Sequence, residues 1–183
     1  MTNRTRKRTT NTGRIESAVL VPLFYKNDKL HILFTKRSFN VMHHKGQISF
    51  PGGARSEADE SLEDTALRES WEEIGLYPEN VEIIGQLDDT LTSTSNFIIS
   101  PYVGLIPYPC QLTINPNEIM EVFDMPLEDL LSKANFKEEV QENENGMETV
   151  YFYKYKGKLI WGATANILKQ LLDELKSGSG AQD

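Results

Sequence analysis

The sequence has a single cysteine and no long apolar run, and each absence excludes a class of protein. Cys110 has no partner for a disulfide within the chain, which favours a reducing compartment. No stretch approaches the about 18 consecutive apolar residues that a membrane-spanning helix needs. The first residues also lack the apolar core of a secretory signal. We therefore expect a cytoplasmic protein with no membrane association.

Acidic residues are absent from positions 1–14, which hold five basic side chains. The rest of the chain carries 14 basic against 27 acidic side chains, a net charge of −13. A body this acidic is a poor match for nucleic acid, so the sequence predicts no nucleic-acid partner. We expect residues 1–14 to be a disordered, solvated arm. Their basic side chains are the sole support for an alternative, an RNA-processing protein.

The composition is that of an ordinary globular protein, with 39% apolar and 25% charged residues. The length suits one domain, and no repeat or long linker divides the chain. We therefore expect the basic arm (1–14), a single domain (15–176) and a flexible tail (177–183). Strands and helices share one core, so the fold class is α+β. The oligomeric state is open between a monomer and a homodimer.

Turn residues separate short apolar segments that are typical of strands. The Lys26-Asn27-Asp28 turn predicts a hairpin between its flanking segments, and Lys156-Gly157-Lys158 predicts a second hairpin. Two further helices are expected near the carboxyl end of the chain. The expected strands are 17–25, 30–35, 46–50, 81–87, 102–106, 151–155 and 159–161; the helices are 125–133 and 163–175. Pro51-Gly52-Gly53 and the polar stretch 88–96 are expected to be loops.

One acidic helix is clearly delimited, over residues 61–74. Ser61 and Asp64 have the spacing of a capping box, which marks its start. Gly75 suits the position just past the last turn, and Pro78 prevents the helix from resuming.

The two sides of this helix differ in character. At 100° per residue, the apolar residues Leu67, Trp71 and Ile74 share one sector and are expected to face the core. The opposite sector holds three glutamates at spacings i, i+3 and i+4, whose carboxylates can converge on one point. A backbone carbonyl of the preceding Gly-Gly loop would complete an oxygen cage, which suits Mg²⁺ or Mn²⁺ and a phosphate-containing substrate.

Residues 53–76, GARSEADESLEDTALRESWEEIGL, resemble the signature box of the Nudix hydrolases. The matching positions are Arg68, Glu69, Glu72, Glu73 and Gly75. One departure is visible. Counted from Gly53, Asp59 takes the first acidic position of the box, which leaves eight residues before Arg68 where the usual box has seven. Glu60 fits that gap but lies one place too far from the glycine.

A longer upstream segment, LFTKRSFNVMHHKGQISFPGG at 33–53, resembles the extra motif of the coenzyme A diphosphatase branch, in which the extended spacing also occurs. That branch usually has an arginine where this chain has Met42. Likenesses at 117–130 and 160–168 extend the resemblance over most of 17–175.

The resemblance implies a Nudix α/β/α sandwich with a mixed β-sheet. It also implies metal-dependent hydrolysis of the diphosphate bridge of coenzyme A or acyl-CoA, giving adenosine 3′,5′-bisphosphate and 4′-phosphopantetheine or its acyl form. One alternative is a Nudix diphosphatase that acts on ADP-ribose, dinucleotides or altered nucleotides. Another is a non-catalytic nucleotide-binding module, which the intact glutamates disfavour.

The resemblance further assigns residue roles. Mg²⁺ or Mn²⁺ would be held by Glu69, Glu72, Glu73 and Gly53. Arg68 would position a glutamate, and the general base is open between Glu69 and Glu72 in the box and Glu118 and Glu121 in the later segment. The side chains expected at the phosphates of the substrate are Arg37, His43, His44 and Lys45.

Overall fold

The computed structural model describes residues 6–9, 13–40, 44–92, 95–143 and 146–179. The strands are β1 (Ile15–Lys26), β2 (Lys29–Arg37), β3 (Ile48–Ser49), β4 (Gly52–Ala54), β5 (Glu82–Gln86), β6 (Thr90–Leu91), β7 (Phe97–Leu105), β8 (Ile119–Pro126), β9 (Phe136–Asn143), β10 (Gly146–Tyr155) and β11 (Lys158–Trp161). The α-helices are α1 (Leu62–Ile74), α2 (Leu127–Leu131) and α3 (Gly162–Ser179), with 3-10 turns at Pro78–Asn80 and Lys133–Asn135.

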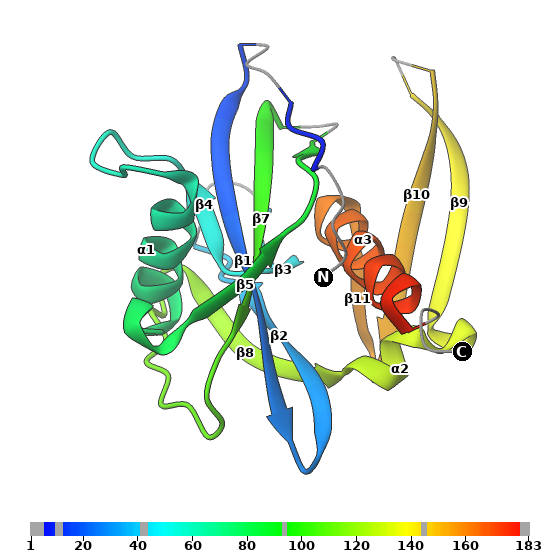
Figure 1. Cartoon of the computed structure of the whole chain (residues 1–183). Coiled ribbons are helices and arrows are strands. Elements are labelled where there is room, and N and C mark those ends of the chain that lie inside the picture. The colour runs from blue at the N-terminus through cyan, green and yellow to red at the C-terminus, as the bar shows by residue number, and fades with distance from the viewer. Residues whose placement is uncertain (1–5, 10–12, 41–43, 93–94, 144–145, 180–183) are drawn as a thin grey trace.

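A central mixed sheet has the strand order β3-β2-β1-β7-β5, with β4, β6 and β8 paired to β1, β7 and β2. Strands β1 and β7 are parallel, and the other pairs are antiparallel. Helix α1 covers one face of this sheet and α3 lies on the other side, where a second sheet, β11-β10-β9, packs against it (Figure 1). The predicted α+β class and α/β/α sandwich are therefore confirmed. No helix in the described ranges is long and apolar enough to cross a membrane.

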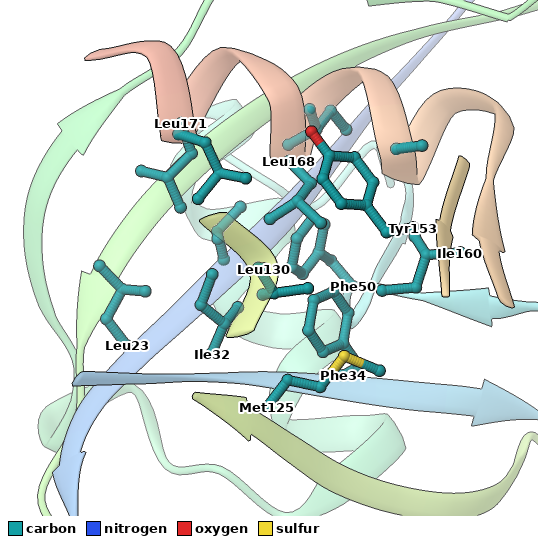
Figure 2. Close-up of a cluster of buried hydrophobic side chains, with 14 of the residues drawn as sticks. Leu23, Ile32, Phe34, Phe50, Met125, Leu130, Tyr153, Ile160, Leu168 and Leu171 are labelled. Atoms are coloured by element: carbon teal, nitrogen blue, oxygen red, sulfur yellow. The ribbon is translucent and has the colours of Figure 1, made fainter. Parts of the chain in front are cut away.

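Apolar side chains fill the space on both faces of the central sheet. The cluster on the α3 side joins Phe34 and Phe50 of the central sheet to Tyr153 of the second sheet and Leu168 of α3 (Figure 2). The two phenylalanine rings stack with centroids 5.0 Å apart. A second cluster lies under α1. The two clusters fix α1 and α3 on opposite sides of one sheet.

The first hairpin forks, and the fork receives the Gly-Gly segment. Strands β1 and β2 pair only near their turn, where Leu23 is opposite Ile32. Beyond that point β3 pairs with β2, and β4 pairs with β1 in the opening between them. The predicted loop at Pro51-Gly52-Gly53 is therefore wrong for the two glycines, which begin strand β4. Glycine permits this pairing, because a Cβ on Gly52 would lie 2.3 Å from the Ala18 carbonyl oxygen.

Helix α1 begins and ends as predicted, and Ile74 of the expected stripe is buried, but the rest of the buried face differs from the prediction. Ser61 forms the capping box with Asp64, and Gly75 adopts the left-handed conformation at φ 67°. Trp71 is 48% exposed, so the expected apolar stripe is wrong at its centre. The helix instead packs on the sheet through small residues such as Ala66 and Ser70. Glu73 lies on this side of the helix and is buried with them.

Several further expectations need correction. Strands β8 and β9 were not predicted, and the expected 88–96 loop contains strand β6. The expectation of a solvated basic arm is wrong for residues 6–9, which hydrogen-bond to residues 87–89.

Candidate active site

A cleft of about 1380 Å³ lies beside the carboxylate-bearing side of α1. Glu69 and Glu73 of α1, strand β4 and the loop carrying Glu118 contribute one part of its lining. Strand β10 and the start of α3 contribute another part, which includes Phe152 and Ile167. The acidic helix therefore opens into a large cleft with an apolar portion.

Arg68 holds together the carboxylates of the signature box. Its Nε and Nη2 donate to Asp59 at 2.8 and 2.9 Å. Its Nη1 donates to Glu69 at 2.8 Å and to Glu72 at 3.0 Å, and Nη2 also reaches the Ala54 carbonyl at 3.1 Å. The guanidinium holds the pKa of Asp59 well below its usual range. Arg68 thus contacts the carboxylates of Asp59, Glu69 and Glu72 at once.

Glu73 lies inside the protein, between Arg37 and the Gly-Gly strand. It is 1% exposed, and its carboxylate accepts from Arg37 Nη1 at 3.3 Å and from the Gly52 amide at 3.2 Å. Burial, more than the nearby Glu69 and Glu118, raises the pKa of Glu73 to about 8. The buried Arg37 Nε has no hydrogen-bond partner among the described residues. Arg37 lines the cleft beside these carboxylates, while its Nε stays buried.

Glu69 is in close contact with the Gly53 backbone. A Cβ on Gly53 would lie 2.4 Å from Glu69 Oε2, so only glycine leaves room for this carboxylate. Burial raises the pKa of Glu69, although Arg68 opposes the shift. The expected proximity of Gly53 to the acidic helix is therefore present.

The expected convergence of all three glutamates is not present. Among the described residues, no three carboxylate, imidazole or thiolate groups are disposed around one point. Glu69 and Glu72 turn toward Arg68, whereas Glu73 turns toward Arg37. The donor set still fits a hard divalent cation, because adjacent carboxylates and the Gly-Gly backbone share one edge of the cleft. Of the three glutamates, Glu69 and Glu73 line the cleft, and Glu72 does not in this structure.

The remaining predicted residues divide between the cleft and the surface. Glu118 lines the cleft and accepts from Asn115 Nδ2 at 3.0 Å. Glu121 instead accepts from Lys158 Nζ at 2.7 Å, and the same ammonium lies 3.9 Å above the Phe123 ring. Glu121 does not line the cleft, so the structure does not bring it to the site.

His44 lines the cleft, and its Nδ1 is 3.0 Å from Gln47 Oε1. Lys45 is exposed on the same turn. The predictions for His43 and Met42 concern positions outside the described residues.

Two features of the site were not predicted from the sequence. Asp59 was noted only for its spacing, yet it anchors Arg68; four donors in contact with one carboxylate could not be read from the box. The wall formed by Phe152, Trp161 and Ala163 was also missed. The likeness at 160–168 was the available signal for that wall.

The fold and the carboxylate-bearing helix define a class of hydrolases that act on pyrophosphate bonds. The model of the NUDIX domain matches residues 14–146, which is more than half of the chain, and the chain therefore belongs to the Nudix family. Nudix hydrolases act on small nucleoside diphosphate substrates and generally use divalent metals such as Mg²⁺ or Mn²⁺.

The relatives agree with this assignment. An uncharacterized Nudix hydrolase NudL from Photorhabdus laumondii is 37% identical over 93% of this chain and 89% of its own length. The protein of the same name from Pectobacterium atrosepticum is 38% identical over 85% of this chain and 80% of its own. A solved structure, the NUDIX domain of Shewanella oneidensis NrtR complexed with ADP ribose, is 25% identical with a TM-score of 0.52, covering 64% of this chain and 76% of that one.

Proposed function

We propose that this Nudix hydrolase cleaves the diphosphate bridge of coenzyme A or acyl-CoA. The products are adenosine 3′,5′-bisphosphate and 4′-phosphopantetheine or its acyl form. The observation that carries the proposal is the cleft, which joins the acidic edge to an apolar wall that includes Val150, Phe152 and Ile167. A substrate with a diphosphate at one place and a long, weakly polar arm at another matches such a lining. The motif at 33–53, which reaches from strand β2 to strand β4, supports the same branch.

Glu69, Glu72 and Glu73 are the residues that would hold Mg²⁺ or Mn²⁺, together with the Gly53 backbone. When bound, the cation neutralises phosphate charge and lowers the pKa of a coordinated water. Arg37, which lines the cleft and is partly exposed, would bind a phosphate oxygen beside Glu73 through its guanidinium.

Arg68 would set the orientation of Glu69 and Glu72, because it contacts both carboxylates and is itself fixed by Asp59. The general base is then Glu69, Glu72 or Glu118, whereas Glu121 does not line the cleft. Of His44 and Lys45, His44 lines the cleft and would contact a phosphate there.

The substrate is tested by incubating the protein with Mg²⁺ and coenzyme A, ADP-ribose, a diadenosine polyphosphate or a deoxynucleoside triphosphate. Products are identified by mass. We expect coenzyme A to give the highest kcat/KM, and we expect one of its products to have the mass of 4′-phosphopantetheine. If any other compound is turned over about tenfold better, the coenzyme A assignment is rejected.

ADP-ribose is the second candidate. The specific observation in its favour is the Shewanella oneidensis NUDIX domain, whose structure was solved with that compound. ADP-ribose lacks the long arm, so it would leave the apolar wall of β10 and α3 largely unused. The same product analysis separates the two candidates.

The Gly53→Ala variant tests the contact between strand β4 and Glu69. The added Cβ would meet the end of a flexible side chain, and the carboxylate moves aside rather than the backbone. We expect the free energy of unfolding to change by less than about 1 kcal/mol and kcat to fall by about tenfold or more. Wild-type turnover by a stably folded Gly53→Ala variant would show that the position of Glu69 is not required.

A further inference from the structure

Residues 6–9 dock on the segment 87–92 through a partly buried ion pair. Arg6 Nη2 pairs with Asp89 Oδ1, and the Asp89 side chain is only 2% exposed. Arg6 Nε also donates to the Leu87 carbonyl at 3.1 Å, and Arg6 Nη2 donates to Ser100 Oγ at 3.1 Å. The guanidinium thereby connects the segment 87–92 to strand β7. A contact with three partners fixes one position for Arg6.

Backbone groups continue this contact. The Asp89 amide donates to the Lys7 carbonyl at 3.2 Å, and the Thr9 amide donates to Asp89 Oδ2 at 2.8 Å. The Lys7 amide donates to Asp88 Oδ1 at 2.9 Å. These bonds set the register of one segment against the other, so the docking does not depend on charge alone.

The segment that Arg6 contacts at Asp89 forms part of the cleft wall two residues further along the chain. Leu91 and Thr92 line the cleft, and strand β6 has only two residues, so its pairing with β7 supplies few hydrogen bonds. Support also comes from α3, where Gln170 Oε1 accepts from the Asp88 amide at 3.1 Å. Arg14 Nη1 donates to the Thr92 carbonyl at 2.9 Å. Thr92 is also bonded to Phe97 of β7, since its amide donates to the Phe97 carbonyl at 3.2 Å and its hydroxyl accepts from the Phe97 amide at 3.0 Å. The wall is therefore held by β7, by α3 and by the amino-terminal segment.

We propose that Arg6 and Asp89 form a positioning pair that fixes the 87–92 wall for substrate binding. Neither side chain lines the cleft, so the pair acts through Leu91 and Thr92. The proposal uses the proposed function only in that the substrate occupies this cleft. Loss of the pair loosens the wall before chemistry takes place, and it weakens substrate binding more than it slows turnover.

The kinetic test compares Arg6→Ala with Arg8→Ala. Arg8 is exposed in the same segment, so the Arg8→Ala variant loses the same charge but keeps the contact between Arg6 and Asp89. With coenzyme A and Mg²⁺, we expect Arg6→Ala to raise KM about fivefold to tenfold, with kcat within about twofold. We expect Arg8→Ala to keep the wild-type KM. Arg6→Lys should raise KM less than Arg6→Ala because it keeps the charge, but it should not match the wild type because an ammonium lacks the planar set of donors of a guanidinium. An Arg6→Ala KM equal to that of Arg8→Ala overturns the proposal.

Hydrogen exchange of the substrate-free protein gives a readout independent of activity. We expect amides in 87–92 to exchange about tenfold faster in Arg6→Ala than in Arg8→Ala. Equal exchange overturns the docking, and faster exchange with an unchanged KM overturns the positioning role. If coenzyme A is not hydrolysed, the kinetic comparison uses the diphosphate that the protein does turn over. The same KM pattern then supports the pair while the coenzyme A assignment fails.

Discussion

Replacing Glu73 with glutamine is expected to reduce turnover by about 100-fold or more while leaving the fold intact. Burial raises the pKa of Glu73 to about 8, so a neutral side chain at this position is less unfavourable than at an exposed site. Glutamine resembles that neutral form in size and keeps one acceptor for Arg37 or the Gly52 amide. We expect the free energy of unfolding to stay within about 1 kcal/mol of wild type, measured by urea denaturation in a metal chelator.

The loss should appear in metal binding as well as in rate. A ligand that binds only the folded protein raises Tm, so Mg²⁺ should stabilise the wild type more than Glu73→Gln. Glu63→Gln is the matched control, because Glu63 lies in the first turn of the same helix and does not line the cleft. Full activity in Glu73→Gln, or an equal loss in Glu63→Gln, would contradict the role proposed for Glu73.

Local signals were sufficient for the elements whose ends are set by neighbouring residues. Helix α1 begins at a reciprocal side-chain cap and ends at a glycine with positive φ, and both features are visible within a few positions of sequence. The first hairpin is equally local, since Asn27 and Asp28 both have positive φ in its two-residue turn. In such places sequence spacing and spatial contact coincide.

The contacts that complete the site join residues far apart in the chain. Arg37 reaches Glu73 across 36 positions, and Arg6 reaches Asp89 across 83. Helical periodicity placed Glu73 with the exposed glutamates, because Trp71 was expected to fill the core. The small residues of α1 let the helix approach the sheet closely, and Glu73 is buried because it lies on the same side of the helix as these residues. No local pattern records which face a helix will turn to a sheet when small and large apolar residues compete.

The Asp59→Asn variant is expected to show the largest loss of stability. The Asp59 carboxylate accepts from the Ser56 amide, the Thr65 hydroxyl and two nitrogens of Arg68, all within 2.9 Å. The side-chain amide of asparagine accepts only through its oxygen. Arg68 therefore loses the charge of one of its carboxylate partners, and the amide nitrogen faces an N–H or O–H group that donated to Asp59. We expect the free energy of unfolding to fall by about 2 to 3 kcal/mol at pH 7, measured by urea denaturation. Asp28→Asn, at an exposed turn, is the matched control and should stay within about 0.5 kcal/mol.

The pH dependence identifies the charge as the cause of this loss. Because Arg68 lowers the folded-state pKa of Asp59 below the ordinary value of 3.8, the ionised carboxylate stabilises the fold fully above that value. The contribution disappears as the pH falls from the ordinary value toward the folded-state pKa, since protonation then removes the charge in the folded protein as well. The difference in unfolding free energy between wild type and Asp59→Asn should therefore be constant from about pH 5 to 7 and shrink below about pH 4. A difference that persists unchanged under acid conditions would assign the loss to the altered shape of the amide, and the Asp59–Arg68 charge pair would then contribute nothing to stability.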